Sequence, residues 1–204
     1  PMQRSLVGSE MCIRDRPKTG TRPTTDRTKE AIFSHLDSWG VLDDARVLDL
    51  FAGTGALGIE ALSRGARELV AVESSRPAAA LITKTLAQLQ KNRSWDASLK
   101  ARVLVKKAEQ VAGGFGEPFD VIFIDPPYAY ETAECNQLLS DLAAGSATNE
   151  NTVIMLERSV RSDDPTAPGG WQITESRNYG ETAVFYIESA DDDSDIERSD
   201  DSAA

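Results

Sequence analysis

The sequence has 204 residues, 40% of them hydrophobic and 27% charged, which is ordinary for one globular domain. No apolar stretch approaches the roughly 20 residues of a membrane helix and no signal peptide is evident, so we expect a cytoplasmic protein without a membrane partner. Two cysteines and one histidine are too few for a disulfide framework, histidine-based catalysis or a metal cluster, and we predict no metal.

The formal net charge of −11 is unusual for an enzyme of nucleic acids, but the acids are unevenly spread. Residues 188–204 carry eight acids and one arginine. We therefore expect a domain over residues 17–188 and an acidic disordered tail over residues 189–204. Residues 1–16 match no later pattern and are expected to be a non-native or disordered leader. The bulk charge does not exclude RNA, although no large basic face is visible in the sequence.

Residues 22–36 open with a proline, two hydroxyl residues and an acid, which together predict the start of a helix. A capped surface helix is the simpler interpretation and the one that these residues alone favour. The functional alternative is that Arg22, Thr25 and Arg27 close over a cofactor or face RNA phosphates.

Strand and helix patterns then alternate along the chain. We predict strands at residues 46–50, 68–72, 101–105, 119–124 and 152–156, and helices at 56–64, from Ser75 onward and at 135–142. Residues 171–176 and 182–187 predict a hairpin around Asn178, Tyr179 and Gly180. This order predicts an α/β fold with a doubly wound, mostly parallel sheet, closed by an antiparallel pair. The very apolar strand at 119–124 is expected at its centre.

The first strand runs into Gly53, Gly55 and Gly58, a G-x-G-x-x-G pattern that opens a helix. This pattern alone is weak evidence, because dehydrogenases use it to hold the pyrophosphate of a dinucleotide. Asp49 lies four residues before the first of these glycines, where a carboxylate would repel a pyrophosphate. It would suit S-adenosylmethionine, which has no phosphate and carries an ammonium and a sulfonium group.

The second strand ends in Glu73, twenty residues after Gly53, where a carboxylate can accept both hydroxyls of a ribose. Each acid also has a simpler explanation: Asp49 caps its own turn, and Glu73 is a surface acid at a strand end. The combination of both acids with the glycines at working spacing favours the cofactor interpretation.

The fourth strand ends in Asp125, Pro126, Pro127 and Tyr128, a more specific signal. The prolines fix the backbone and leave carbonyls as acceptors, so Asp125 and the Pro126 carbonyl can accept both hydrogens of an exocyclic amino group. Tyr128 would stack on a flipped or single-stranded base. Catalysis would consist mostly of orientation and desolvation. The simpler explanation is a strand that ends in a Pro-Pro turn.

The segments RPTTDRTKEAIFSHL, VLDLFAGTGALGIEALSRGA, AVESS, VIFIDPPY and NYGETAVFYI resemble the RsmD-like family of 16S rRNA guanine-N2 methyltransferases, over about residues 17–187. The resemblance implies a Rossmann-like class I methyltransferase fold, S-adenosylmethionine as donor, and one guanine of 16S rRNA, in free rRNA or the assembling 30S subunit, as target. We expect a monomer.

By match to the family motifs, residues 125–128 fall on the catalytic clamp. The cofactor positions are Asp49, Phe51, Ala52, Gly53, Thr54, Gly55, Glu73, Ser74 and Ala108. The family's basic N-terminal hairpin is not supplied by residues 1–16, which puts RNA affinity in doubt. The family's Asp-Ala pair near the adenine is Lys107-Ala108 here, so an adenine contact must come from backbone amides or from Glu109.

Three other functions remain open. An adenine-N6 methyltransferase of DNA or another RNA would use the same clamp, because the clamp recognises an amino group and not a purine. An NAD-dependent oxidoreductase would bind NAD and give Asp125 no role. A non-catalytic assembly factor would bind the cofactor without turnover.

Overall fold

The computed structural model of the chain describes residues 26–93 and 95–190. Its helices are α1 (Asp26–Trp39), α2 (Ala56–Ser63), α3 (Arg76–Leu89) and α4 (Thr132–Ala144), with a 3-10 helix η1 (Ala108–Gln110). Its strands are β1 (Arg46–Asp49), β2 (Glu68–Val72), β3 (Lys100–Leu104), β4 (Val121–Ile124), β5 (Val153–Ser159), β6 (Trp171–Tyr179) and β7 (Thr182–Ser189). The expected leader, Arg22, Thr25 and the tail from residue 191 lie outside the described residues.

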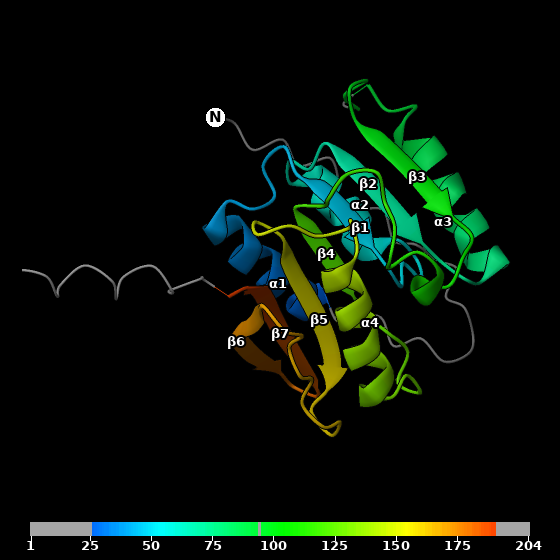
Figure 1. Cartoon of the computed structure of the whole chain (residues 1–204). Coiled ribbons are helices and arrows are strands. Elements are labelled where there is room, and N and C mark those ends of the chain that lie inside the picture. Colours follow the sequence, from blue (N-terminus) through cyan, green and yellow to red (C-terminus); the bar gives the residue numbers. More distant parts are fainter. Residues whose placement is uncertain (1–25, 94, 191–204) are drawn as a thin grey trace, which may run out of the picture.

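The strands form one sheet in the order β3-β2-β1-β4-β5-β7-β6 (Figure 1). Parallel pairing joins β3 to β2, β2 to β1, β1 to β4 and β4 to β5, whereas β7 is antiparallel to both β5 and β6. The predicted fold class is therefore confirmed. β4 is the middle strand and all four of its residues are buried, as its apolar sequence predicts.

Helices cover both faces of the sheet, so the fold has three layers. Apolar residues of α1, α2 and α3 share one core cluster with alternate residues of the strands, such as Val47 and Phe123. Residues of α4 and η1 share the other cluster with the intervening strand residues, such as Leu48 and Ile122. Figure 1 shows α4 on the near side of the sheet and α1 beyond it. No helix among the described residues is long and apolar enough to cross a membrane.

Element ends differ from the sequence expectation where tertiary contacts decide them. α1 continues to Trp39, because this ring packs against His35 and Tyr186. α4 begins at Thr132, because the side chain of Glu134 accepts the backbone N–H of Glu131 and so caps the helix. The hairpin turn is Gly180–Glu181, one residue later than the predicted centre, since Tyr179 still pairs with Thr182 in the ladder.

Candidate active site

A cavity of about 810 Å³ opens at the carboxyl ends of the parallel strands. Its walls come from the turn after β1, the end of β2, the segment after β3, the loop after β4, the end of β5 and the β6–β7 turn. Open α/β sheets bind ligands at this edge. The volume lies within the range of small-molecule and cofactor sites.

The turn after β1 is held between its two neighbouring strands. The N–H of Leu50 donates to the Phe123 carbonyl of β4, and the N–H of Ala52 donates to the Val72 carbonyl of β2, both at 3.0 Å. Gly53 (φ 54°) and Gly55 (φ 79°) then take left-handed conformations that disfavour other residues. These bonds and glycines turn the chain from the sheet edge into α2.

Gly58, the third glycine of the motif, is required by packing between α2 and β2. A Cβ atom built at this position would lie 2.4 Å from Cδ1 of Leu69, which is fully buried. The absence of a side chain therefore brings α2 against β2 and fixes the direction of the glycine turn.

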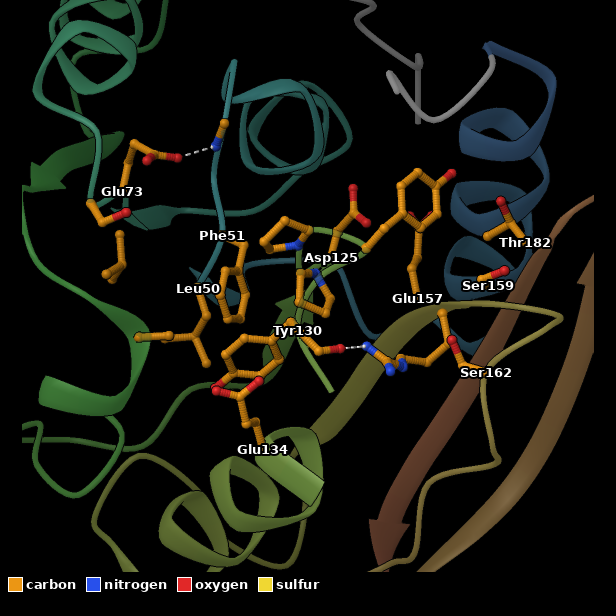
Figure 2. Close-up of a pocket in the computed structure, with 18 of the residues that line it drawn as sticks. Leu50, Phe51, Glu73, Asp125, Tyr130, Glu134, Glu157, Ser159, Ser162 and Thr182 are labelled. Carbon is orange, nitrogen blue, oxygen red and sulfur yellow. Dashed lines mark hydrogen bonds between the residues drawn. The ribbon is translucent and has the colours of Figure 1, made fainter. Parts of the chain in front are cut away.

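Glu73 is fixed in orientation by two backbone amides. The N–H of Gly53 donates to its Oε2 at 2.8 Å, and the N–H of Ser75 donates to its Oε1 at 2.6 Å. Because each carboxylate oxygen has further lone pairs, both can still accept a hydroxyl. Figure 2 shows Glu73, Phe51 and Asp125 in this order across the cavity.

Asp49 lies beneath the glycine turn and is 1% exposed. Its Oδ2 accepts the N–H of Gly58 at 3.1 Å, so it does cap the turn. Its Oδ1 has no hydrogen-bond partner among the described residues. Burial, followed by the negative charges of Asp125 and Glu73, raises the pKa of Asp49 to about 7 against the opposing effect of the Gly58 amide. A cation in the cavity would relieve this unfavourable charge.

The loop after β4 is held as a tight turn. The N–H of Tyr130 donates to the Pro127 carbonyl at 2.8 Å, and the Tyr130 carbonyl accepts a hydrogen bond from Arg158 of β5 at 2.7 Å. The ring of Tyr130 packs edge-on against Phe51, with centroids 5.2 Å apart. The loop is thereby tied both to β5 and to the turn after β1.

Two tyrosines of this loop have different environments. The hydroxyl of Tyr130 donates to Glu109 at 2.8 Å, and burial together with this carboxylate raises the pKa of the phenol. Tyr128, by contrast, is 61% exposed and lines the cavity. Its ring is thus accessible to a planar ligand at the mouth.

Glu157 adds an acid that the sequence analysis missed. It is 4% exposed, lies near the end of β5 and lines the cavity. The parallel register pairs Ile124 with Leu156, so Asp125 and Glu157 follow at equivalent positions on neighbouring strands. Glu73, Asp49, Asp125 and Glu157 therefore lie at or near the carboxyl ends of four adjacent strands.

The structure brings together most of the predicted site residues. Those that line the cavity are Arg27, Phe51, Gly53, Glu73, Ser74, Ala108, Asp125, Pro126, Pro127 and Tyr128. The predicted cofactor positions that do not line it are Asp49, Ala52, Thr54 and Gly55. The cavity residues missed include Lys106, Tyr130, Glu157, Arg158 and Tyr179. For Glu157 a signal was available, since it follows an apolar strand as Glu73 and Asp125 do.

The donor set of this cavity is acidic, but within residues 26–93 and 95–190 no group of three or more His, Cys, Asp and Glu side chains is placed to hold a metal ion. The cavity instead offers oriented carboxylates, backbone amides and aromatic rings. These groups suit an organic cofactor that carries positive charge and hydroxyl groups.

Comparisons with known proteins agree with this geometry. The family described as conserved hypothetical protein 95 matches residues 11–188. Ribosomal RNA small subunit methyltransferase D of Escherichia coli K12 is 32% identical over 191 residues, which cover 93% of this chain and 90% of that protein. The protein of the same name in Haemophilus influenzae is 32% identical over 164 residues and covers 79% of each chain.

Solved structures share the fold. A conserved hypothetical protein of Streptococcus pyogenes has a TM-score of 0.69 and 31% identity, over 79% of this chain and 95% of that one. Magnesium protoporphyrin IX methyltransferase of Synechocystis, solved with bound S-adenosylmethionine, has a TM-score of 0.61 over 80% of this chain and 79% of that one. At 15% identity, the second likeness concerns the fold alone.

Proposed function

This chain belongs to the RsmD-like family of methyltransferases, and on that basis we propose that it transfers a methyl group from S-adenosylmethionine to the exocyclic N2 amino group of a guanine in 16S rRNA. One observation carries the proposal: the Asp-Pro-Pro-Tyr loop after β4 and the glycine turn after β1 line the same cavity. A cofactor turn and an amino-group clamp in one cavity are what methylation of a base amino group requires.

The chain's own residues fit S-adenosylmethionine, which supplies an electrophilic methyl group on a positively charged sulfur. Glu73 would accept the ribose hydroxyls, because two amides already orient its carboxylate. Phe51 and the segment around Ala108 would flank the adenine, and Gly53 would bring backbone close to the methionine part. Asp49 would act from beneath the turn, through Gly58 and through its charge. The acids of this cavity would repel the pyrophosphate of NAD.

Asp125 and the Pro126 carbonyl would accept the two hydrogens of the guanine amino group. Such a grip directs the nitrogen lone pair towards the cofactor and excludes water from the reacting atoms. Asp125 need not be a strong base, because the methylated nitrogen can lose its proton to water. Tyr128 would stack on the base, which must leave its helix or lie in a single strand to enter. Arg27, which also lines the cavity, would contact a phosphate of the same nucleotide or its neighbour.

Labelled S-adenosylmethionine and undermethylated 30S particles test this proposal. The modified nucleoside is identified by mass spectrometry for the native chain, for Asp125→Ala, and for Asp164→Ala as a matched control. Asp164 is an exposed acid that does not line the cavity. We expect N2-methylguanosine from the native chain and the control, and at least a 100-fold lower rate from Asp125→Ala, because misorientation of the nucleophile has costs of this order.

Each result has a defined meaning. Formation of N6-methyladenosine would support the role of the clamp, but it would mean that the substrate is the amino group of adenine and not that of guanine. Methyl transfer by Asp125→Ala at the native rate would show that Asp125 does not hold the amino group during the reaction. Binding of S-adenosylmethionine by the native chain, measured by calorimetry, without any transfer to 30S particles or to free 16S rRNA would contradict the enzymatic function and favour a non-catalytic role.

A further inference from the structure

A strongly basic surface, which the sequence analysis did not identify, lies at one edge of this acidic protein. Residues 76–107 contain eight Lys and Arg residues and one acid, Asp96, although the whole chain has a net charge of −11. The eight are Arg76, Lys84, Lys91, Arg93, Lys100, Arg102, Lys106 and Lys107, and we call them the basic band. They belong to α3, β3 and the segments that follow each of these elements.

Every side chain of the basic band is exposed. None of the eight forms an ion pair with a residue that the structure describes. Six of the other eight described cations behave differently, whereas Arg27 and Arg158 also form no ion pair with a described residue. Those paired with carboxylates are Lys29, Arg46, Arg64, Arg67, Arg161 and Arg177. Glu68 of β2 interacts electrostatically with Arg102 and Lys100, but this carboxylate already pairs with Arg46. Most of the positive charge of the band is thus not neutralised within the described fold.

The basic band runs along one edge of the molecule. β3 is the strand at one edge of the sheet, and α3 lies beside it (Figure 1). Ile82 and Leu86 of α3 belong to the core cluster against which Ala101 and Val103 of β3 pack. A helix of this length spans about 21 Å. The band extends to the candidate active site, because Lys106 and Lys107 line the cavity.

Protection of an exposed sheet edge explains only part of this pattern. Charged side chains on an edge strand oppose pairing with another chain, and Lys100 and Arg102 have that position. Lys84 lies on α3, and Lys91 and Arg93 lie in the segment between α3 and β3, where no edge needs protection. A ligand with regularly spaced negative charges accounts for all eight.

We propose that the basic band is a phosphate-contacting surface for the rRNA that flanks the target base. The proposal rests on the methyltransferase function proposed above. Exposed unpaired Lys and Arg residues attract phosphates and release their counterions, which gives affinity without reading a sequence. The flanking strand leaves the cavity past Lys106 and Lys107 and follows α3 and β3 towards Lys91 and Arg93.

Salt dependence of binding tests the surface independently of catalysis. Binding of the full chain to undermethylated 30S particles is measured without S-adenosylmethionine, between about 50 and 200 mM salt. The band variant carries Lys84→Gln and Lys91→Gln, which lie away from the cavity. The control variant carries Arg67→Gln and Arg177→Gln, which remove the same charge from residues already paired with Asp44 and Glu175.

Each phosphate contact contributes about 0.7 to 0.9 to the slope of log K against log salt. We therefore expect the slope of the band variant to be lower by about 1.4 to 1.8, with roughly tenfold weaker binding at low salt. The control variant should match the native chain, and the affinity for S-adenosylmethionine should be unchanged in both.

Three results would overturn the inference: a native slope in the band variant, an equal loss in the control variant, or native binding that does not depend on salt. A native slope in the band variant would favour an acidic protein, and not RNA, as the partner of the basic band. Failure of the native chain to transfer methyl groups would contradict the proposed function, whereas this binding measurement would still be interpretable.

Discussion

Replacement of Asp49 by Asn tests whether ionisation of the Asp49 carboxyl destabilises the folded chain. The pKa of Asp49 is raised from 3.8 to about 7, first by burial and then by Asp125 and Glu73. The unfolded chain loses this proton near pH 4 and the folded chain near pH 7. The contribution to stability is therefore fully present below the unfolded pKa and is lost as pH rises to about 7.

The size of this effect follows from the shift. A difference of one pKa unit between the folded and unfolded chain corresponds to about 1.4 kcal/mol. Ionisation of Asp49 therefore lowers the free energy of unfolding by about 4 kcal/mol at pH 8. Asparagine does not ionise and keeps an oxygen for the Gly58 amide. We expect Asp49→Asn to exceed the native stability by up to about 4 kcal/mol at pH 8, and by less than about 1 kcal/mol at pH 4. Urea unfolding between these pH values measures the difference.

The same charge makes cofactor binding depend on pH. At pH 6 a group with a pKa of about 7 is about 0.9 protonated, so binding of the positively charged S-adenosylmethionine should release nearly one proton. At pH 8 the release should fall to about 0.1. Calorimetry in buffers of different ionisation enthalpy counts these protons, and Asp49→Asn should release none from this site.

Two results would refute this reasoning. A stability difference between native chain and variant that does not change with pH would show that Asp49 is not the titrating group. Equal proton release by both proteins at pH 6 would place the titration elsewhere in the site. In either case the interaction of Asp49 with Gly58 would remain as its only supported role.

Three further predictions concern the turn and its surroundings. Glu73→Gln should weaken S-adenosylmethionine binding about 10- to 100-fold by calorimetry, because it removes charged hydrogen bonds, and unchanged affinity would contradict the ribose role. Gly58→Ala should cost about 1–3 kcal/mol in urea unfolding, since its Cβ would meet Leu69 at 2.4 Å. Its cost should be smaller in a Leu69→Ala background, where the clash is absent, and a neutral Gly58→Ala would refute the packing argument. Tyr130→Phe should lose about 1 kcal/mol of stability and keep the Phe51 contact, and no loss would mean that the bond to Glu109 adds nothing.

The sequence predicts the sheet and the position of the site well, for a local reason. Each parallel strand except β3 is a short apolar run, and its end is marked by a glycine turn or an acid. Such signals need no knowledge of distant neighbours. Asp125 and Glu73 could thus be placed at one edge before any strand order was known, and both residues line the same cavity.

Features that depend on neighbours could not be predicted in this way. The position of Glu157 beside Asp125 follows from the pairing of β4 with β5. The contacts of Tyr130 require the turn after β1, the η1 segment and β5 to converge. Recognition of the basic band requires the edge position of β3 and the knowledge of which cations are already paired. A count of charges in the sequence does not separate paired from unpaired side chains.

The net charge of −11 therefore says little about the substrate. Negative charge of Glu73, Asp125 and Glu157 in the cavity, with Asp49 beneath it, attracts a cationic cofactor and would repel RNA phosphates from the reaction centre. Unpaired positive charge is concentrated instead at the α3 and β3 edge, where phosphates can be held without contact with these acids. The acids at the cavity and the cations at the α3 and β3 edge thus attract different ligands. An acidic protein can therefore bind RNA through a local basic surface. The control with Arg67 and Arg177 separates this local effect from the total charge.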